Sequence, residues 1–352
     1  MSKNLSELSG RGGIVDNLFE KMGKAAEKSG TVPQEELDRL AEEFLVGKAN
    51  TYGTITAYDF MKPENQGKKA YICNGSACLC AGTQDKVMDE LSKHYKREEI
   101  GHMTCLGRCH ENSAFHIGGN NYSGEASKNL SQIVSTQGAL QPKDKYNVGA
   151  NKVVLTEAFT DVDQYYSLLK DVLNKAPETV LDEIKTSNIR GRGGAGFPMG
   201  VKWDFCRKAE SDTKFIICNA DEGDPGAYSD RYLLEERPHA VLFGMMVGGF
   251  CMGAQWGILY IRAEYPESVG IVQNAIQELR DRNLLGKDIL GTGFDFDFKV
   301  IKAQGAYICG EETALINSIE GQRPEVRTRP PFPAIQGLFN KPTIVNNVET
   351  LA

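Results

Sequence analysis

The chain has 352 residues, of which 41% are apolar and 25% are charged, and its formal charge at neutral pH is -7. This length allows two or three domains, each with a core of its own, and the composition is that of a folded protein rather than a disordered one. A net negative charge argues against a broad nucleic-acid-binding surface, which needs clustered lysine and arginine. We therefore expect a folded protein of several domains that does not bind nucleic acid.

Neither a membrane span nor a secretion signal is predicted. The uncharged run over residues 241–261 reaches the roughly 20 residues that could cross a bilayer, but Gln255 and repeated glycines interrupt it, so it predicts a buried helix followed by a buried strand. The N-terminal sequence MSKNLSELSGRGG lacks the apolar core of a secretory signal. Nine cysteines, an odd number, favour metal ligation or redox use over a disulfide framework. We expect the chain to work in the cytoplasm.

The first part of the chain predicts helices and then a small α/β module. Apolar residues recur at helical spacing over residues 1–60, and Thr31 and Gln34 have the spacing of a capping box. From Lys69 the pattern changes to a strand, KAYIC, followed by a helix over residues 87–95. We expect an N-terminal helical segment over residues 1–60 and a compact α/β domain over residues 61–137.

The second part predicts a larger α/β domain. Residues 138–152 are polar, contain Pro142 and read as a linker, so this domain covers residues 153–352. Helical and strand-like stretches alternate in it, which indicates a sheet covered by helices. Helices are expected over residues 161–174, 177–188 and 268–283, strands over 214–219, 256–261 and 294–301, and an ordered loop rich in proline and arginine over 323–342.

Four cysteines form two loops in the first α/β domain, Cys73 with Cys78 in CNGSAC and Cys105 with Cys109 in CLGRC. Four thiolates in two pairs suit either a tetrahedral zinc ion or a [2Fe-2S] cluster. Structural zinc loops usually hold their cysteines in a tight CxxC turn, so these wider spacings favour the cluster. Buried structural thiols are a third interpretation, which the glycine-containing turns disfavour. Cys80 is left without a role.

These motifs, preceded by helices and by TYGTITAYDF, resemble the thioredoxin-like [2Fe-2S] ferredoxin subunit of respiratory complex I and of soluble NAD-linked hydrogenases. The resemblance covers residues from about 14 to 137. It implies that Cys73, Cys78, Cys105 and Cys109 are the four ligands of the cluster.

The segment GRGGAGFP satisfies the pattern GxGxxG at Gly191, Gly193 and Gly196. The segment before it has helical rather than strand periodicity, so a dinucleotide-binding fold of the usual Rossmann order is not predicted. Clustered glycines still let backbone N–H groups approach a phosphate, with Arg192 and Lys202 supplying positive charge. A glycine-rich turn with solvated arginines is the alternative for this loop in isolation.

Three further segments strengthen the hypothesis of a ligand site. The strand KFIIC runs into the acidic NADEGDPG, and ligands commonly bind at that end of an α/β sheet. A strand AYIC over residues 306–309 leads into GEETALINSIEG, where Glu311 and Glu312 lie in the first turn of a helix. RTRPPFP adds a basic loop with an aromatic residue, and Asn346 and Asn347 add paired amides.

In this order, GRGGAGFPMGVKW, NADEGDPGAYSDR, GEETALINSIEG and NNVETLA resemble the NADH-binding flavoprotein subunit of complex I and the diaphorase subunits of NAD(P)-linked hydrogenases and formate dehydrogenases. The resemblance implies an α/β chain in which a thioredoxin-like [2Fe-2S] domain precedes a Rossmann-like FMN- and NADH-binding domain. It implies FMN binding by Gly191, Arg192, Gly193, Gly194, Lys202, Asn219, Asp221, Gly310, Glu311, Asn346 and Asn347. It implies nucleotide binding by Phe197, Phe205, Asp224, Glu312, Arg329 and Phe332.

Two departures from the family pattern stand out. Gly223 replaces the usual serine and Asp224 the usual glutamate, so the sequence does not choose between NADH and NADPH. The family flavoprotein also continues past NNVETLA into a ubiquitin-like domain and a [4Fe-4S] domain, so we expect this chain to be part of a longer subunit.

The resemblance implies an FMN-dependent NAD(P)H dehydrogenase in which hydride passes between NAD(P)H and FMN and electrons then pass singly to iron-sulfur clusters. No acid–base residue is required for that reaction. Expected partners are NAD(P)H and the other iron-sulfur and catalytic subunits of a redox complex. A non-catalytic electron-relay module with the same fold, or a zinc-stabilised nucleotide sensor, are the alternatives.

Overall fold

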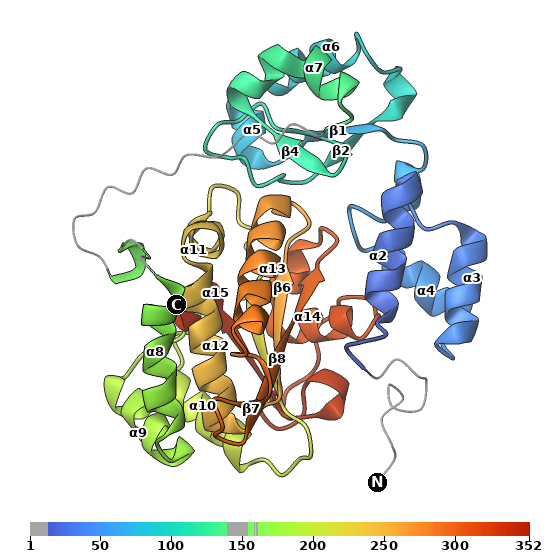
Figure 1. The fold of residues 1–352 in the computed structure, drawn as a ribbon. Coiled ribbons are helices and arrows are strands. Elements are labelled where there is room, and N and C mark those ends of the chain that lie inside the picture. Colours follow the sequence, from blue (N-terminus) through green and yellow to red (C-terminus); the bar gives the residue numbers. More distant parts are fainter. Residues whose placement is uncertain (1–12, 139–153, 158, 160) are drawn as a thin grey trace.

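The computed structural model describes residues 13–138 and 154–352, except residues 158 and 160. The expected linker over residues 138–152 lies almost wholly outside this part of the chain. In Figure 1 a small α/β domain sits above a larger one, with the N-terminal helices beside the larger one. None of the described helices is long and apolar enough to span a bilayer.

The small domain contains a four-stranded sheet in the order β2-β1-β3-β4. Strand β1 (Ala70–Cys73) is parallel to β2 (Ile100–Met103) and antiparallel to β3 (Phe115–Ile117), which pairs with β4 (Asn120–Tyr122). Helices α6 (Gln84–Leu91) and α7 (Leu130–Ser135) pack on this sheet, and the short helix α5 (Ser76–Cys80) follows β1. The strand expected at KAYIC is confirmed.

The large domain contains a five-stranded sheet in the order β7-β8-β6-β5-β9. Four strands are parallel, and β7 is an antiparallel edge strand. The strand bounds are β5 Phe215–Ala220, β6 Trp256–Ile261, β7 Gly286–Ile289, β8 Phe294–Lys302 and β9 Thr343–Asn347. The three strands and three helices expected from periodicity are all present, within two residues at each end.

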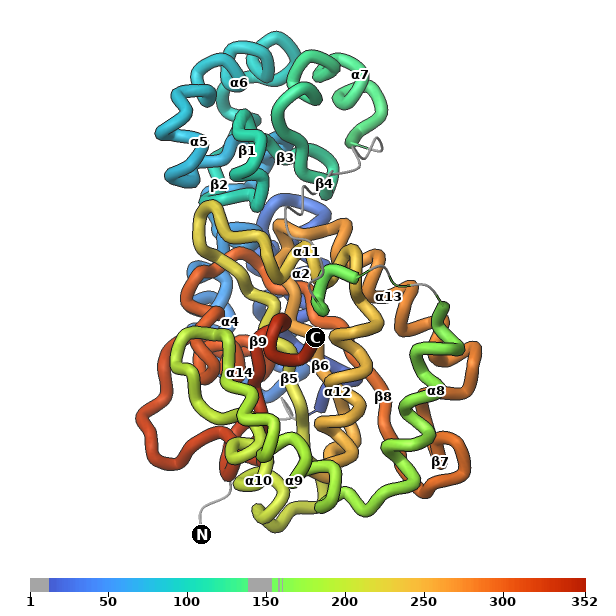
Figure 2. The backbone as a smooth tube through the Cα atoms, turned by 90° about the vertical axis from the view of Figure 1, so that its left-hand side faces the viewer, coloured from blue at the N-terminus to red at the C-terminus, as the bar shows by residue number. Residues whose placement is uncertain are grey.

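Helices cover both faces of the five-stranded sheet. The bounds on one face are α8 Val162–Leu173, α9 Pro177–Ser187, α10 Met199–Lys208, α11 Ser229–Glu236, α12 Pro238–Met252, α13 Pro266–Asp281 and α15 Val348–Leu351. Those on the other are α2 Leu18–Ser29, α3 Gln34–Glu43, α4 Lys48–Ile55 and α14 Glu312–Ile319. Because side chains alternate along a strand, Ile216 and Cys218 of β5 pack in the apolar core on the first of these faces. Phe215 and Ile217 pack in the core on the other face. Figure 1 shows α12 and α2 on opposite sides of the strands, and Figure 2 shows the small domain above the large one in a view turned by 90°.

The N-terminal helices therefore belong to the core of the large domain, although the small domain follows them in sequence. Phe19 of α2 is fully buried and its ring lies 5.1 Å from that of Tyr58 and 6.3 Å from that of Tyr260 in β6. Sequence periodicity predicted these helices but not the sheet that they cover.

Two local predictions were wrong. The capping box at residues 31–34 is absent, because Pro33 is the residue that precedes α3 and the Thr31 hydroxyl donates instead to the Met61 carbonyl. The strand expected over residues 306–309 is a 3-10 turn, Tyr307–Gly310. The sheet strand β8 ends earlier, at Lys302, and Gly305 then takes a left-handed conformation with φ 78°, which turns the chain away from the sheet.

Candidate functional site

A cavity of about 560 Å³ opens at the carboxyl ends of β5 and β9. This is the edge of a parallel sheet at which ligands commonly bind, and the volume is within the range of small-molecule sites. Three segments, the glycine loop, the acidic loop after β5 and the turn before α14, surround it. The lining residues are Arg192, Gly193, Gly194, Asn219, Asp221, Glu222, Gly223, Asp224, Ala227, Ser229, Asp230, Tyr307, Ile308, Gly310, Glu311, Asn347 and Glu349.

The glycine loop connects two helices, α9 and α10, and no strand precedes it. This confirms that the GxGxxG pattern does not mark a Rossmann turn here. Gly194 has φ 112° and Gly196 has φ 61°, conformations that side chains disfavour, so glycine is needed at both positions. A Cβ on Gly193 would come within 3.4 Å of the Asn347 side chain, which shows how closely the loop approaches β9.

The glycine loop also contacts α15 through hydrogen bonds of Arg192. The Arg192 amide donates to the Thr350 hydroxyl at 2.8 Å, and the Arg192 guanidinium pairs with Glu349 at 2.9 Å. Gly191 lies just outside the cavity, where its amide donates to the Phe197 carbonyl at 2.9 Å. Arg192 is the one cationic side chain among the lining residues, so this end of the cavity suits an anionic phosphate group.

Burial raises the pKa of two carboxyl groups in the cavity wall. Burial raises the pKa of Asp221 to about 8, against the opposing charge of Arg262, whose Nε lies 3.8 Å from Asp221 Oδ1. Burial likewise raises the pKa of Asp230 to about 7, and Asn347 donates to Asp230 at 2.6 Å. Asp221 Oδ2 is buried and has no hydrogen-bond partner in the described part of the chain.

Other acidic side chains of the cavity stabilise local structure. Glu311 precedes α14 and its Oε2 accepts from the amides of Thr313 and Ala314 at 2.8 and 2.9 Å. Glu222 accepts from the amides of Asp230 and Arg231 at the first turn of α11. These contacts stabilise the first turns of α14 and α11.

The paired amides lie on opposite faces of β9. Asn347 lines the cavity, whereas Asn346 is buried and its Oδ1 accepts from the Trp203 indole N–H at 3.0 Å. Consecutive strand residues point in opposite directions. The structure therefore places only Asn347 of the predicted pair at the cavity.

Lys202 lies outside the lining and joins a charged cluster with Glu312 and Arg329. Its ammonium donates to Glu312 at 3.1 Å and to the Val345 carbonyl at 2.7 Å, and Arg329 donates to Glu312 at 2.7 Å. The three aromatic residues expected at the nucleotide are all about half exposed: Phe197 at 48%, Phe205 at 50% and Phe332 at 58%. Asp224, also expected there, lies in the cavity lining and accepts from the Tyr307 hydroxyl at 2.7 Å.

Sequence reasoning missed several lining residues, chiefly Glu222, Asp230, Tyr307 and Glu349. Each lies inside or next to a motif that had been singled out, in NADEGDPGAYSDR, AYICGEE or NNVETLA. Their closeness in sequence to these motifs could therefore have identified them. It could not have predicted that Asp230 contacts Asn347, which lies 117 residues away.

The four expected cluster ligands come together in the small domain. Cys73 ends β1, Cys78 lies in α5, and Cys105 and Cys109 lie in the loop after β2. The sulfurs of Cys105 and Cys109 are 3.4 Å apart. The amides of Gly75 and Leu106 point at the Cys73 sulfur, at 3.3 and 3.4 Å. Cys206, Cys218, Cys251 and Cys309 are buried in the large domain.

The arrangement of these thiols bears on the kind of metal centre. The thiols form two pairs, Cys73 with Cys78 and Cys105 with Cys109. The two pairs adjoin, since the amide of Leu106, the residue after Cys105, donates to the Cys73 sulfur at 3.4 Å. Two adjoining pairs, with amides directed at sulfur, fit two irons better than one zinc ion.

The cavity likewise fits a flavin mononucleotide. Glycine amides and Arg192 suit a phosphate at one end, while the carboxyls of Asp221 and Asp230, whose pKa values burial raises, offer hydrogen bonds to hydroxyl and ring groups. The orphaned Asp221 Oδ2 is a buried polar atom that a ligand would satisfy.

Comparison with known proteins finds relatives that match about half of the chain. The chain is 50% identical over 196 residues to the NADP-reducing hydrogenase subunit HndC of Solidesulfovibrio fructosivorans, covering 54% of this chain and 40% of that one. It is 46% identical over 196 residues to an NADH-quinone oxidoreductase subunit of Aquifex aeolicus, covering 54% and 46%. It is 51% identical over 187 residues to the NAD-reducing hydrogenase HoxS subunit alpha of Cupriavidus necator, covering 53% and 31%. The matched part thus spans less than half the length of these relatives.

A solved structure resembles nearly the whole chain. The crystal structure of an NAD⁺-reducing [NiFe]-hydrogenase in its air-oxidised state superposes with a TM-score of 0.73 at 26% identity, covering 95% of this chain and 59% of that one.

Two family models match successive parts of the sequence. Residues 11–137 match the thioredoxin-like [2Fe-2S] ferredoxin family, and residues 184–352 match the Nuo51 FMN-binding domain. The matches confirm the predicted resemblance, fold class and cofactors. The chain is therefore similar to the thioredoxin-like [2Fe-2S] ferredoxin family in its first part and to the Nuo51 FMN-binding domain family in its second part.

Proposed function

We propose that this chain is an NAD(P)H:acceptor oxidoreductase module that works as a subunit of a larger redox complex. The observation that carries the proposal is that one residue, Arg262, connects the two sites within one chain. The loop with Cys105 and Cys109 rests on the large domain beside the cavity, where the Cys105 carbonyl accepts from Arg262, just after β6. The hydrogenase and quinone oxidoreductase names of the relatives support the same class of reaction.

FMN, when bound, would accept hydride from a nicotinamide and release electrons one at a time to iron-sulfur centres. The residues we propose to hold it line the cavity: Arg192, Gly193, Gly194, Asn219, Asp221, Gly310, Glu311 and Asn347, with Gly191 and Lys202 behind them. Their task is to place the ring, exclude water and supply hydrogen bonds, because hydride transfer between stacked rings needs no general acid or base. Cys73, Cys78, Cys105 and Cys109 would bind the [2Fe-2S] cluster.

The nicotinamide nucleotide would enter over the exposed aromatic residues Phe197, Phe205 and Phe332. Their half-exposed rings offer apolar faces for stacking. Glu312 and Arg329 form a charged cluster with Lys202, and Asp224 lies at the cavity wall. The carboxylates could accept hydrogen bonds from ribose hydroxyls.

We also propose that the chain has other redox subunits as partners and works in the cytoplasm. The electrons would leave to other iron-sulfur and catalytic subunits, as the multi-subunit names of the relatives suggest. All nine cysteines are free thiols, which suits the reducing cytoplasm.

The test is an anaerobic absorption titration of the purified protein with NADH and, separately, with NADPH, together with iron and flavin analysis. We expect flavin and two irons per chain, and bleaching of both chromophores by at least one nucleotide. A protein that contains zinc, or a coloured protein that neither nucleotide reduces, would contradict the proposal.

A variant separates nucleotide use from flavin binding. Replacing Glu312 by Gln removes the charge held by Lys202 and Arg329, so we expect slower nucleotide turnover with FMN still bound. Glu325→Gln, a change of the same kind on an exposed residue, is the control. Unchanged steady-state kinetics in Glu312→Gln would count against the assignment of Glu312.

A further inference from the structure

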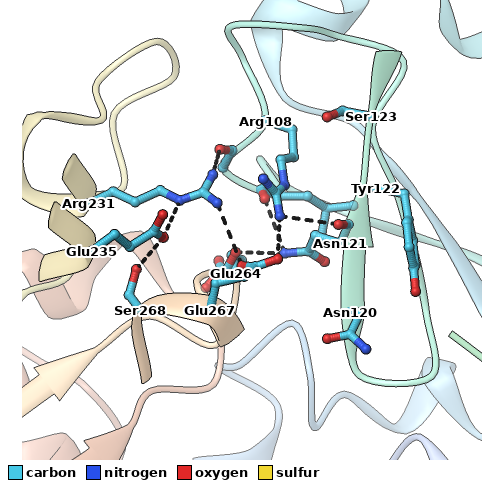
Figure 3. Close-up of polar contacts among 12 residues, drawn as sticks. Arg108, Asn120, Asn121, Tyr122, Ser123, Arg231, Glu235, Glu264, Glu267 and Ser268 are labelled. Atoms are coloured by element: carbon cyan, nitrogen blue, oxygen red, sulfur yellow. Dashed lines mark hydrogen bonds and ion pairs between the residues drawn. The ribbon is translucent and has the colours of Figure 1, made fainter. Parts of the chain in front are cut away.

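A buried polar seam joins the small domain to the large one (Figure 3). Arg108, between Cys105 and Cys109 in the ligand loop, is buried and pairs with Glu267 at the start of α13. Arg231 of α11 donates to the Gly107 carbonyl in the same loop at 3.1 Å and pairs with Glu235 at 2.8 Å. The ligand loop is therefore held by charged groups of the flavin-binding domain.

The seam is closely packed as well as hydrogen-bonded. A Cβ on Gly107 would lie 2.4 Å from the ring of Tyr265, so only glycine permits this approach. The guanidinium groups of Arg231 and Arg262 lie 5.3 and 5.0 Å from that ring. Asn121 of β4 adds a hydrogen bond to the Glu264 carbonyl at 2.6 Å. Such contacts favour one fixed arrangement of the two domains.

Arg262 occupies the centre of this seam and reaches both sites. Its side chain is 4% exposed. Its NH2 group donates to the Cys105 carbonyl and to Glu264, both at 2.9 Å, and its NH1 group donates to the Glu222 carbonyl. Its Nε lies 3.8 Å from Asp221. One guanidinium therefore contacts a cluster-ligand residue on one side and the wall of the flavin cavity on the other.

Only arginine can satisfy this geometry. The planar guanidinium offers five donors in a fixed fork, whereas a lysine ammonium is a point charge that could not reach these acceptors together. Glu264, whose carboxylate is 5% exposed, provides the opposite charge beside it, and Glu264 Oε2 has no hydrogen-bond partner among the described residues.

We propose that Arg262 is a positioning residue that fixes the cluster loop against the flavin cavity and, through its charge, makes the [2Fe-2S] centre easier to reduce. This inference rests on the proposed function. Reduction adds one negative charge to the cluster, and a buried positive charge hydrogen-bonded to the Cys105 carbonyl stabilises that charge. Glu264 acts in the opposite sense, because its negative charge disfavours reduction.

The experiment is a redox titration of the cluster in the intact holoprotein, followed by electron paramagnetic resonance of the reduced centre. At the midpoint potential of the wild-type cluster, we expect Arg262→Gln to lower the ratio of reduced to oxidised cluster by roughly tenfold, the order of one nearby buried charge. Glu264→Gln, which is nearly isosteric, is expected to raise the ratio. Arg282→Gln, which removes an exposed arginine paired with Asp163, is the control and should leave the ratio unchanged.

The opposite signs separate a charge effect from a loss of structure. If Arg262→Gln does not fold, the rise in Glu264→Gln alone still tests the proposal. Unchanged potentials in the variants that fold, or shifts in the same direction, would overturn it. A wild-type protein with no [2Fe-2S] signal or no nucleotide-driven reduction would instead refute the proposed function.

Discussion

At the scale of single residues, burial decides the charge of the cavity wall. Asp221 and Asp230 have pKa values raised to about 8 and about 7, in both cases chiefly because burial disfavours the ionised carboxylate. Six carboxyl groups line the cavity against one arginine. The raised pKa values reduce the negative potential that an anionic ligand would meet, and a carboxyl that is protonated can donate a hydrogen bond.

The raised pKa of Asp221 predicts how stability depends on pH. The native state binds a proton at Asp221 that the unfolded chain releases above the ordinary value of 3.8. The contribution of Asp221 to the free energy of unfolding should therefore fall as the pH rises from about 4 to about 8, with a slope set by the extra bound proton. Asp221→Asn should make this slope shallower by about one proton. Urea unfolding of the flavin-free protein at several pH values measures it, and identical slopes would contradict the assignment.

At the scale of elements, the glycine loop combines a helix–helix connection with close approach to β9. Its anion-binding potential comes from backbone conformation at Gly194 and Gly196, not from a strand–turn–helix unit. Close approach also accounts for the glycines of α12. A Cβ on Gly244 would lie 1.9 Å from the Leu351 carbonyl oxygen, so glycine lets α15, directly after β9, pack on that helix.

Replacing Gly194 by alanine should weaken FMN binding by straining the glycine loop. It has φ 112°, and no neighbouring atom lies within 4 Å of the position that an added methyl group would take, so Gly194→Ala adds backbone strain alone, about 1 kcal/mol. If the loop binds FMN in this conformation, its affinity should fall about fivefold. Gly253→Ala is a matched control, since Gly253 ends α12 with φ 73° and equally open surroundings. Fluorescence titration with FMN should show weakening in Gly194→Ala and not in Gly253→Ala.

At the scale of the whole molecule, the order of segments in sequence differs from their order in space. Along the sequence, the helices α2 to α4, which cover one face of the large sheet, come first. The small domain follows them, and the strands of the large sheet come last. The small domain is thereby anchored on its N-terminal side through α2 to α4, and it also contacts the large domain through the polar seam. This arrangement favours a fixed distance between the two sites.

The N-terminal helices should accordingly stabilise the flavin-binding domain. Phe19→Ala removes a fully buried ring between Tyr58 and Tyr260, and such truncations cost about 3 kcal/mol or more. We expect flavin release at a clearly lower temperature, measured by flavin fluorescence during heating. Val15→Ala, in the same segment but with a side chain 83% exposed, should have little effect. Equal release temperatures in the two variants would show that the helices do not support the cavity.

Local sequence patterns were enough to predict several of the elements and the chemistry of the motifs. Periodicity placed β6 at its observed bounds, and four cysteines in two loops predicted the metal centre, because both signals depend on local spacing. Three features are visible in the three-dimensional structure alone: α2 covers the large sheet, Asn346 turns away from the cavity while Asn347 faces it, and Arg262 contacts both sites. Those features depend on contacts between residues distant in sequence, and a local sequence pattern does not specify which distant residues come into contact.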